Sequence, residues 1–433
     1  ISSDQVESMN VLKDAAATAL YGSRAANGVI LIVTKKGRKN APTKVTFRSS
    51  VGFADRAVDQ HDRFGTDDLM TYQWEAIRNS NQYEGGQDPI TAGTNASNNL
   101  VLGLGYNPYG PGVPNPVDAN GNLVTSNKLW ETDWEELMFN DNAQRTEYGL
   151  TASGGTENST YFLSANYLDQ EGSVIESDFE RITTRLNVNT DVNNWLDLGF
   201  SSAYSTQKQN RPTQSGGGYQ SAVQWTQIVS SIYPVNRRDE NGEYILDGFG
   251  NTIFDYGDNP QVVNGVRPVF EGENAYGSLF NYDNLNRRHQ FNANGFINIK
   301  FADYLSFKST IGYEQYTFDG FQYIHNEFGY AANAGGRVSQ DRDITRTTNF
   351  TNALNFNKTF GANHNVSANL IQEAYKLNYS TMNAQGIGFL PNVQVLNGST
   401  TPESVGGAIF DQRIESYLAR VAYNYDNKYF LEG

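Results

Sequence analysis

The sequence predicts an all-β chain, namely part of an up-and-down antiparallel β-barrel that crosses a membrane, preceded by the end of a small α+β unit. Three observations predict this class: segments with an apolar residue at every second position, connections that alternate between short and long, and a different pattern confined to the start of the chain. We expect the α+β piece to cover residues 1–40 and the barrel strands to lie within residues 41–433.

Residues 11–37, "VLKDAAATALYGSRAANGVILIVTKKG", have the pattern of an α+β unit. A short strand precedes an alanine-rich helix over 15–21, and a turn leads into an apolar strand over 28–36. The partner strands of such a unit would lie upstream, and residue 1 is not Met, so we expect a piece of a longer chain. Gly22 and Gly28 fit the turn, where glycine supplies positive φ, and their spacing matches neither phosphate-binding loop motif.

Ten later segments alternate apolar and polar residues, and an eleventh begins at Lys428. In "RHQFNANGFINIKF", for example, Phe291, Ile297 and Phe301 share one face while Asn292 and Asn298 lie on the other. Strict alternation over such a length predicts strands with one face in water. The segments lie near 44–54, 143–155, 158–171, 180–193, 195–209, 286–301, 303–318, 344–360, 363–378 and 411–426.

The connections between these segments alternate between short and long. The short ones are "GGTEN", "VNNW", "FADY", "GANH" and "YDNK". This alternation is typical of outer-membrane barrels, which have short periplasmic turns and long extracellular loops, whereas Greek-key sandwiches mix the order. The long connections, expected to be extracellular loops, cover 55–142, 172–179, 210–285, 319–343 and 379–410.

The predicted strands exceed the roughly 9–11 residues that a tilted strand needs to cross a bilayer. We therefore expect walls that stand above the membrane, with the apolar face toward lipid and the Asn, Ser, Thr and Lys face toward a wet lumen. A soluble sandwich with half-buried strands has the same period and stays open as the alternative at this point.

Composition excludes several other classes. The chain has 433 residues and a formal net charge of −15, which argues against nucleic-acid binding because that needs a basic surface. It has no Cys, so disulfides and thiolate metal sites are excluded. No apolar run approaches the ~18 residues of a membrane-spanning helix.

Few residues have the spacing of a catalytic or metal site, and we expect no enzyme and no cofactor. "DANGNL" (118–123) and "DENGEY" (239–244) fail the calcium-loop template and are better read as Asn-Gly hairpin turns. The four His residues are scattered singly. Glu135 and Glu136 are an acidic pair, but no paired spacing of the kind a glycosidase needs recurs.

Any ligand contact is expected from the long loops. The 210–285 loop carries aromatic and Arg side chains that suit the apolar face and hydroxyl rim of a sugar ring, although packing within the loop is the simpler role for each. The candidates are Tyr219, Trp225, Tyr233, Arg237, Arg238 and Tyr256.

The opening stretch resembles the end of the plug domain of TonB-dependent outer-membrane transporters, specifically the SusC/RagA branch. "ETDWEELMF" (131–139), "LTASGGTENSTYFLSANYLDQEG" (150–172) and "FERITTRLNVNTDVNNWLDLGFSSAYS" (179–205) are similar to the first barrel hairpins of that family. In the first of these, Trp130, Asp133 and Trp134 are read as structural. The matching plug positions are Leu12-Lys13-Asp14, Tyr21-Gly22-Ser23-Arg24, Asn27-Gly28-Val29 and Thr34-Lys35-Lys36-Gly37.

The resemblance implies energy-coupled import of oligosaccharides, or sometimes peptides, across the outer membrane of a Bacteroidota-type bacterium. It implies a SusD-like surface lipoprotein over the mouth and a TonB-ExbB-ExbD complex that acts through the plug. The plug motif would gate the lumen, and the basic run Lys35, Lys36, Arg38 and Lys39 would either be a solvated linker or contact acids on the lumen wall.

The chain also departs from the family pattern. The TonB-contacting segment and the earlier plug strands are not in this sequence, and ten or eleven strands are about half of the family's 22. A half-barrel exposes two edges of unpaired backbone groups, each costly in lipid, so a partner half is implied. Two rivals remain: a passive porin, against which the plug motif counts, and a surface β-rich glycan-binding or structural protein of the outer membrane.

Overall fold

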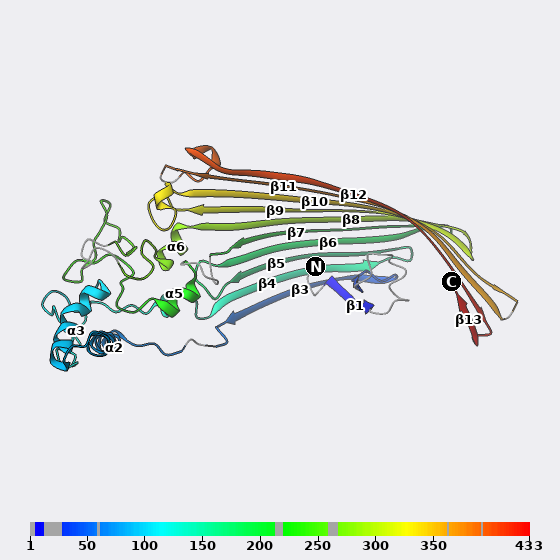
Figure 1. The fold of residues 1–433 in the computed structure, drawn as a ribbon. Helices are drawn as coiled ribbons and strands as arrows, with labels where there is room; N and C mark the ends of the chain where they lie inside the picture. Colours follow the sequence, from blue (N-terminus) through cyan, green and yellow to red (C-terminus); the bar gives the residue numbers. More distant parts are fainter. Residues whose placement is uncertain are drawn as a thin grey trace.

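One antiparallel sheet of eleven strands dominates the computed structural model, which describes residues 5–12, 28–58, 61–212, 220–258, 267–361, 363–390 and 393–433. Figure 1 shows the strands side by side in a curved sheet, and each pairs with its neighbours in sequence order. The strands are β3 (Ala41–Ala54), β4 (Ala143–Gly155), β5 (Ser159–Glu171), β6 (Asp178–Asn193), β7 (Leu196–Asn210), β8 (Asp283–Ala302), β9 (Leu305–Ile324), β10 (Arg337–Phe360), β11 (His364–Ile387), β12 (Thr401–Tyr425) and β13 (Tyr429–Glu432).

The predicted topology is confirmed. All five short connections lie at one end of the sheet, which we call the turn end, and the long ones lie at the other, the rim end. The strands toward the C-terminus are longer than the alternation predicted: β12 begins at Thr401 rather than near 411, and β11 ends at Ile387 rather than near 378. Two loops shrink accordingly, to 325–336 and 388–400.

The two faces of the sheet differ in chemistry as expected. Phe291, Ile297 and Ile311 are 39%, 48% and 54% exposed, so these large apolar side chains do not lie between two protein layers. A sheet with one uncovered apolar face needs a non-aqueous neighbour, which for strands of this kind is lipid. The soluble-sandwich alternative is therefore not supported.

Aromatic side chains bound this apolar face at both ends. Toward the rim, Tyr148 lies opposite Tyr167 and Tyr204 lies opposite Phe291. Toward the turns lie Trp195, Phe301 and other exposed rings. On β8 the segment 291–301 between the two aromatic rows has about the 9–11 residues of a bilayer crossing, and such rows mark the membrane interfaces of outer-membrane barrels.

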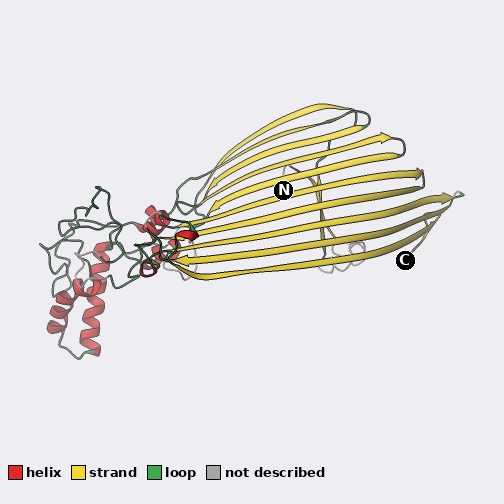
Figure 2. Ribbon diagram, turned by 90° about the horizontal axis from the view of Figure 1, so that it is seen from above, coloured by secondary structure: helices red, strands yellow, loops and turns green. Residues whose placement is uncertain are grey.

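Helices gather at the rim end of the sheet (Figure 2). They belong to what we call the rim domain, residues 61–140, 220–258 and 267–282. Its helical elements are α2 (Thr66–Asn79), the π-helical turn η3 (Ser80–Glu84), α3 (Pro89–Leu104), α4 (Trp134–Met138), α5 (Ala222–Ile228) and α6 (Ala275–Asn281), and short 3-10 turns η4 (Ala332–Ala334) and η5 (Leu396–Gly398) lie in later loops.

Local sequence explains the two long helices of the rim domain. The Asp88 carboxylate accepts from the N–H groups of Ile90 and Thr91 (both 3.1 Å) at the start of α3, and Pro89 occupies the first turn. Gly105, at φ 80°, ends the helix in the left-handed conformation. Both helices bury one stripe at i, i+4 spacing, which packs them together. The stripes are Thr66, Met70 and Trp74 on α2, and Ala92, Ala96 and Leu100 on α3.

No helix in the part of the chain that the structure describes is long and apolar enough to cross a membrane.

Candidate ligand-binding site

The start of the chain forms a hairpin on the polar face of the sheet. β1 (Val6–Leu12) pairs antiparallel with β2 (Val29–Thr34). Next to β1, the Gln5 side-chain amide donates to Ser164 Oγ on β5 at 3.0 Å and accepts from Arg185 Nε on β6 at 3.3 Å. Beyond β2, Asn187 Nδ2 donates to the Lys35 carbonyl at 2.8 Å. The described part of residues 1–40 thus lies on the expected, lumen-facing side.

The chain leaves the hairpin in close contact with the wall. A Cβ on Gly37 would lie 2.3 Å from the carbonyl oxygens of Gly154 and Tyr161, so only glycine fits there. Lys39 forms an ion pair with Asp191, a residue of the polar face of β6. The basic run was expected either to be a solvated linker or to contact acids of the lumen wall. For Lys39, the second of these alternatives is observed.

Most of the predicted plug motif lies outside the described residues: Lys13, Asp14, Tyr21, Gly22, Arg24 and Asn27. Gly28 is described, at φ 94°, and a Cβ there would lie 3.1 Å from the Leu12 carbonyl. The positive φ predicted for Gly28 is observed, while the turn itself lies outside the described residues. A gating role for the motif stays a prediction.

Trp225 and Tyr233, two of the loop residues proposed to contact ligand, lie in the core of the rim domain. Trp225 is fully buried, meets Trp134 edge-on at 5.5 Å between ring centroids, and stacks on Phe270 at the same distance. Tyr233 meets Tyr106 edge-on at 5.3 Å. These rings hold α4, α5 and the loop around Phe270 together. They therefore have the packing role that the sequence analysis gave as the simpler alternative to ligand contact.

Arg267 lies at the centre of this core and is 1% exposed. Its guanidinium lies over the rings of Trp225 (5.1 Å) and Tyr233 (5.7 Å). Nε donates to the Val269 carbonyl and Nη2 to the Phe270 carbonyl, both at 2.7 Å, and Nη2 also donates to the Glu273 carbonyl. Burial lowers the pKa of Arg267, while nearby acids oppose this shift.

Two buried acids accompany Arg267. Asp255 accepts from the Tyr106 hydroxyl at 2.7 and 2.9 Å, and burial raises the pKa of its carboxyl. Glu273 is 2% exposed, and burial raises its pKa to about 7, while a hydrogen bond from Gln220 opposes the shift. One arginine and two carboxyls thus share a desolvated core, where each depends on its hydrogen bonds.

The remaining loop candidates have mixed positions. Tyr256 is buried, stacks on Phe328 at 5.0 Å between centroids and accepts from Asn281 at 3.0 Å. Arg237 is half-buried and pairs with Asp258 at 2.6 Å. Tyr219 lies outside the described residues.

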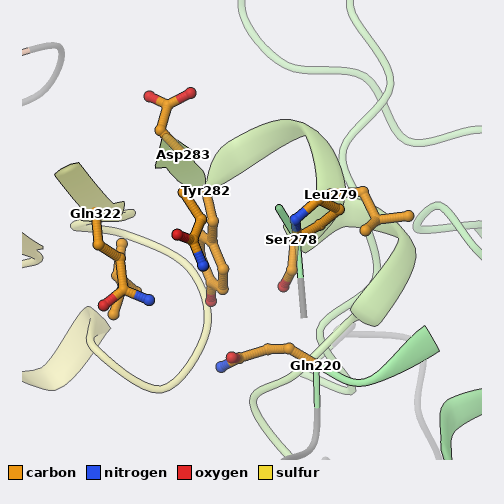
Figure 3. Close-up of a pocket in the computed structure, with 9 residues that line it drawn as sticks. Gln220, Ser278, Leu279, Tyr282, Asp283 and Gln322 are labelled. Carbon is orange, nitrogen blue, oxygen red and sulfur yellow. The ribbon is translucent and has the colours of Figure 1, made fainter. Parts of the chain in front are cut away.

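A small cavity lies between α6 and the rim ends of β8 and β9 (Figure 3). Its volume is about 20 Å³, which is room for a single water rather than for an organic ligand. Gln220, Ser278, Tyr282 and Gln322 supply polar groups around it.

The large cleft of the rim domain, which we call the rim cleft, has a volume of about 1130 Å³. Three parts of the chain line it: residues 58, 61–65 and 69, residues 131–135, and residues 227, 228, 230 and 231. This volume slightly exceeds the ~300–1,000 Å³ typical of small-molecule sites. The cleft could therefore hold several sugar units or a short peptide.

The rim cleft combines aromatic and acidic surface. Phe64 is 58% exposed and packs on Tyr72 at 4.6 Å, and Ile228 is 48% exposed. Its four acids outnumber the one arginine, Arg63, which donates to the Val229 carbonyl at 3.0 Å and whose pKa is lowered by burial. The acids are Asp62, Glu131, Asp133 and Glu135.

Hydrogen bonds hold the cleft walls. Glu131 accepts from the Thr66 N–H at 2.7 Å, which starts α2, and from Lys128 at 3.1 Å. Asp133 caps α4, and Trp134 Nε1 donates to the Ser230 carbonyl at 3.0 Å. The structural role predicted for Asp133 and Trp134 is confirmed, and Trp130 likewise donates to the Ile232 carbonyl at 2.8 Å.

The two Asn-Gly stretches form hairpin turns, as predicted. Asp118 and Asp239 each accept from the N–H groups two and four residues later, and antiparallel bridges flank both turns. A third turn with the same pattern is built on Asp247. Within the described ranges, no group of three or more His, Asp or Glu side chains is arranged to hold a metal ion.

Sequence reasoning did not find the rim cleft. Phe64 and Ile228 are far apart in the chain, and each belongs to a segment read as loop. The only local signal was "ETDWEELMF", whose Asp133 and Trp134 line the cleft.

The chain is similar to TonB-dependent receptors in sequence, although no protein-family model matches it. TonB-dependent receptor P3 of Formosa agariphila is 27% identical over 438 residues, which cover 98% of this chain and 36% of that relative. SusC of Bacteroides thetaiotaomicron is 32% identical over 183 residues, or 42% of this chain and 14% of that relative. The chain thus spans about a third of the length of the first relative. Both relatives are named as receptors rather than enzymes, in agreement with the expected absence of catalysis.

The fold matches a solved transporter over the whole chain. The RagAB peptide importer in its 'open-open' state superposes with a TM-score of 0.74 at 22% identity, and the match covers 100% of this chain and 45% of that one. In sequence and in fold the chain is therefore SusC/RagA-like, similar to part of the TonB-dependent receptors, which are β-barrels of the bacterial outer membrane.

Proposed function

We propose that the protein containing this chain imports oligosaccharides or peptides across the outer membrane, driven by a TonB-ExbB-ExbD complex and in complex with a SusD-like surface lipoprotein. Residues 1–40 would be the end of the plug and residues 41–433 the first half of the barrel. The observation that carries the proposal is the β1–β2 hairpin hydrogen-bonded to the polar face of β5 and β6. A surface binding protein has no need of a segment on that face.

The contacts of this hairpin with the wall are suited to a movable plug. In the described part of residues 1–40 they include three hydrogen bonds of polar side chains, each worth about 1 kcal/mol net, and the close approach of Gly37. The ion pair of Lys39 with Asp191 is largely exposed and adds little. A pulling force on the plug could break such contacts without unfolding the sheet.

A reversible tether between plug and wall tests the proposal. The chain has no Cys, so Gln5→Cys/Ser164→Cys introduces the only thiols of this region. In the intact receptor, a short bifunctional thiol reagent that is cleaved by reductant should stop uptake of labelled oligosaccharide or peptide, and reductant should restore it.

The matched control is Ser201→Cys/Asn294→Cys, which joins directly opposed positions of β7 and β8 on the same face. This tether should leave uptake unchanged because wall strands do not separate. Ligand binding without any uptake, in wild type and tethered forms alike, would instead favour the alternative of a surface glycan-binding or structural protein.

The rim cleft is the proposed first contact of the substrate. Phe64 offers a ring for a sugar face or an apolar side chain, and the acids around it accept from hydroxyl or amide groups. Trp225 would act on the ligand indirectly, because it anchors α5, whose last residue Ile228 lines the cleft. Tyr233 and Tyr256 are buried in packing contacts and, like Trp225, would act only indirectly. Tyr219 and Arg237 remain proposed contacts of the same loop.

Phe64→Ala should weaken substrate binding about 3- to 10-fold, since an aromatic contact is worth about 0.5–1.5 kcal/mol. Phe249→Ala is the matched control, because this ring is 93% exposed and does not line the cleft. Isothermal titration of the purified receptor with oligosaccharide and peptide libraries measures both variants. If the two variants bind substrate with equal affinity, the rim cleft is not the first contact of the substrate.

A further inference from the structure

Four strands repeat one arrangement on their outward, apolar face. On each, an exposed aromatic residue is followed four residues closer to the rim by an exposed Lys or Arg. Because side chains alternate between the faces of a strand, an interval of four keeps both on the same side. The pairs are Tyr204 and Lys208 on β7, Phe291 and Arg287 on β8, Phe350 and Arg346 on β10, and Tyr417 and Arg413 on β12.

The sheet register brings these cations together. Lys208 lies directly opposite Arg287, and Lys376 on β11 lies directly opposite Arg413. Like charges directly opposite each other in a sheet are destabilising unless something neutralises them. Among the described residues, no ion pair within 4 Å is formed by any of these four cations.

Acids lie near these four cations, but none of them forms an ion pair with one. Asp319, opposite Arg287, pairs with Arg342 at 2.5 Å. Asp411 and Glu415, which flank Arg413, accept from Asn378 at 2.9 Å and from the Tyr417 hydroxyl at 2.6 Å. Glu180 lies opposite Lys208 without an ion pair. We call the two pairs of directly opposed cations, Lys208/Arg287 and Lys376/Arg413, rungs. An external anion between the two cations of a rung would supply a counter-charge that no ion pair within 4 Å supplies in the described residues.

The position of the two rungs along the membrane normal indicates which anion binds them. Four residues span about 13 Å along a strand, or about 10 Å along the membrane normal at a tilt of roughly 40°. The aromatic row marks the edge of the hydrocarbon, and the polar layer beyond it is roughly 5–8 Å thick on each side. Long Lys and Arg side chains bend toward that layer, so the cations lie at head-group depth.

We propose that the outward rungs Lys208/Arg287 and Lys376/Arg413 bind the phosphate groups of lipid head groups in the outer leaflet. A phosphate between two opposed cations removes their repulsion, and the guanidinium of each rung can bind it in a bidentate manner. The aromatic residue below each rung packs on the same lipid. A protein partner at the rim would not reach these positions, which face the bilayer.

The test uses the intact receptor in detergent, with native mass spectrometry to count bound lipid. The probes are lipid A with its phosphates, dephosphorylated lipid A, and inorganic phosphate as competitor. Lys208→Gln/Arg287→Gln should lower the affinity for lipid A about 30-fold, which corresponds to about 1 kcal/mol for each cation. Dephosphorylated lipid A should bind wild type and variant equally weakly.

The matched control is Lys300→Gln/Lys308→Gln, which removes the same charge from the lumen side of β8 and β9 and should leave lipid binding unchanged. The folding of Lys208→Gln/Arg287→Gln is checked by the heat-dependent gel shift of a closed barrel. If this variant does not fold, Lys376→Gln/Arg413→Gln is measured in its place. Equal affinities of wild type and both outward variants overturn the proposal. Displacement of lipid A by inorganic phosphate overturns it in favour of a free-anion site.

Discussion

Replacement of Arg267 by Met should open the rim domain while the sheet stays intact. Met keeps most of the side-chain volume but cannot donate to the three carbonyls, of Val269, Phe270 and Glu273, that the guanidinium binds. Each buried acceptor left without a partner costs at least about 1 kcal/mol. We expect a loss of about 3 kcal/mol, or roughly 100-fold in the local opening equilibrium, because relief of the buried charge offsets the lost contacts with Trp225 and Tyr233.

Hydrogen exchange of the intact receptor measures this effect at α5 and α6. The control is Arg237→Met, which removes a half-buried ion pair with Asp258 and should change local opening by less than about 1 kcal/mol. Strands β8 to β12 should keep their protection in both variants, since they share no core with Arg267. Similar exchange of α5 and α6 in the two variants would refute the central role given to Arg267.

Three other predictions follow from the same structure. Burial raises the pKa of Glu273 from its usual 4.5 to about 7 in the folded protein. The folded rim domain therefore holds this proton more tightly than the unfolded chain, and its stability should fall as pH rises from about 4.5 to about 7. The stability of Glu273→Gln, followed by hydrogen exchange, should not fall over this pH range. Ile297→Arg should cost about 2–4 kcal/mol of barrel stability in urea unfolding from vesicles, whereas Asn294→Arg, on the lumen side, should be nearly neutral. Gly28→Ala should speed amide exchange in β1 and β2, because its φ of 94° strains any L-residue, whereas Gly52→Ala, with nothing within 4 Å, should not.

The strands could be predicted wherever lipid and water act on opposite faces. Phe291, Ile297 and Asn298 alternate because one side must be apolar and the other polar. Beyond the bilayer both faces are in water, and the alternation stops. For this reason the pattern predicts loop for the first ten residues of β12, from Thr401, and for the rim ends of β9, β10 and β11, which the structure shows as strand.

The rim domain could be predicted less well, for a different reason. The i, i+4 stripes of α2 and α3 were present in the sequence, but they lie in a stretch rich in Gly, Asn and Pro that indicates loop. The burial of Trp225 and Tyr233 depends on Arg267, more than thirty residues later. The rim cleft joins segments up to about 170 residues apart, which no local pattern reports.

The overhang of the strands has a consequence for any solute that enters from the rim. β10, β11 and β12 have 24, 24 and 25 residues, of which about ten suffice to cross the hydrocarbon. The remainder adds roughly 35 Å of wall above the lipid. Along this overhang the lumen face of β10 and β11 carries hydroxyl, amide and acidic side chains, among them Ser339, Asp341, Asn383 and Gln385. In the proposed importer, a solute would follow this stretch of polar wall after it leaves the rim domain and before it reaches the part of the lumen that lipid surrounds.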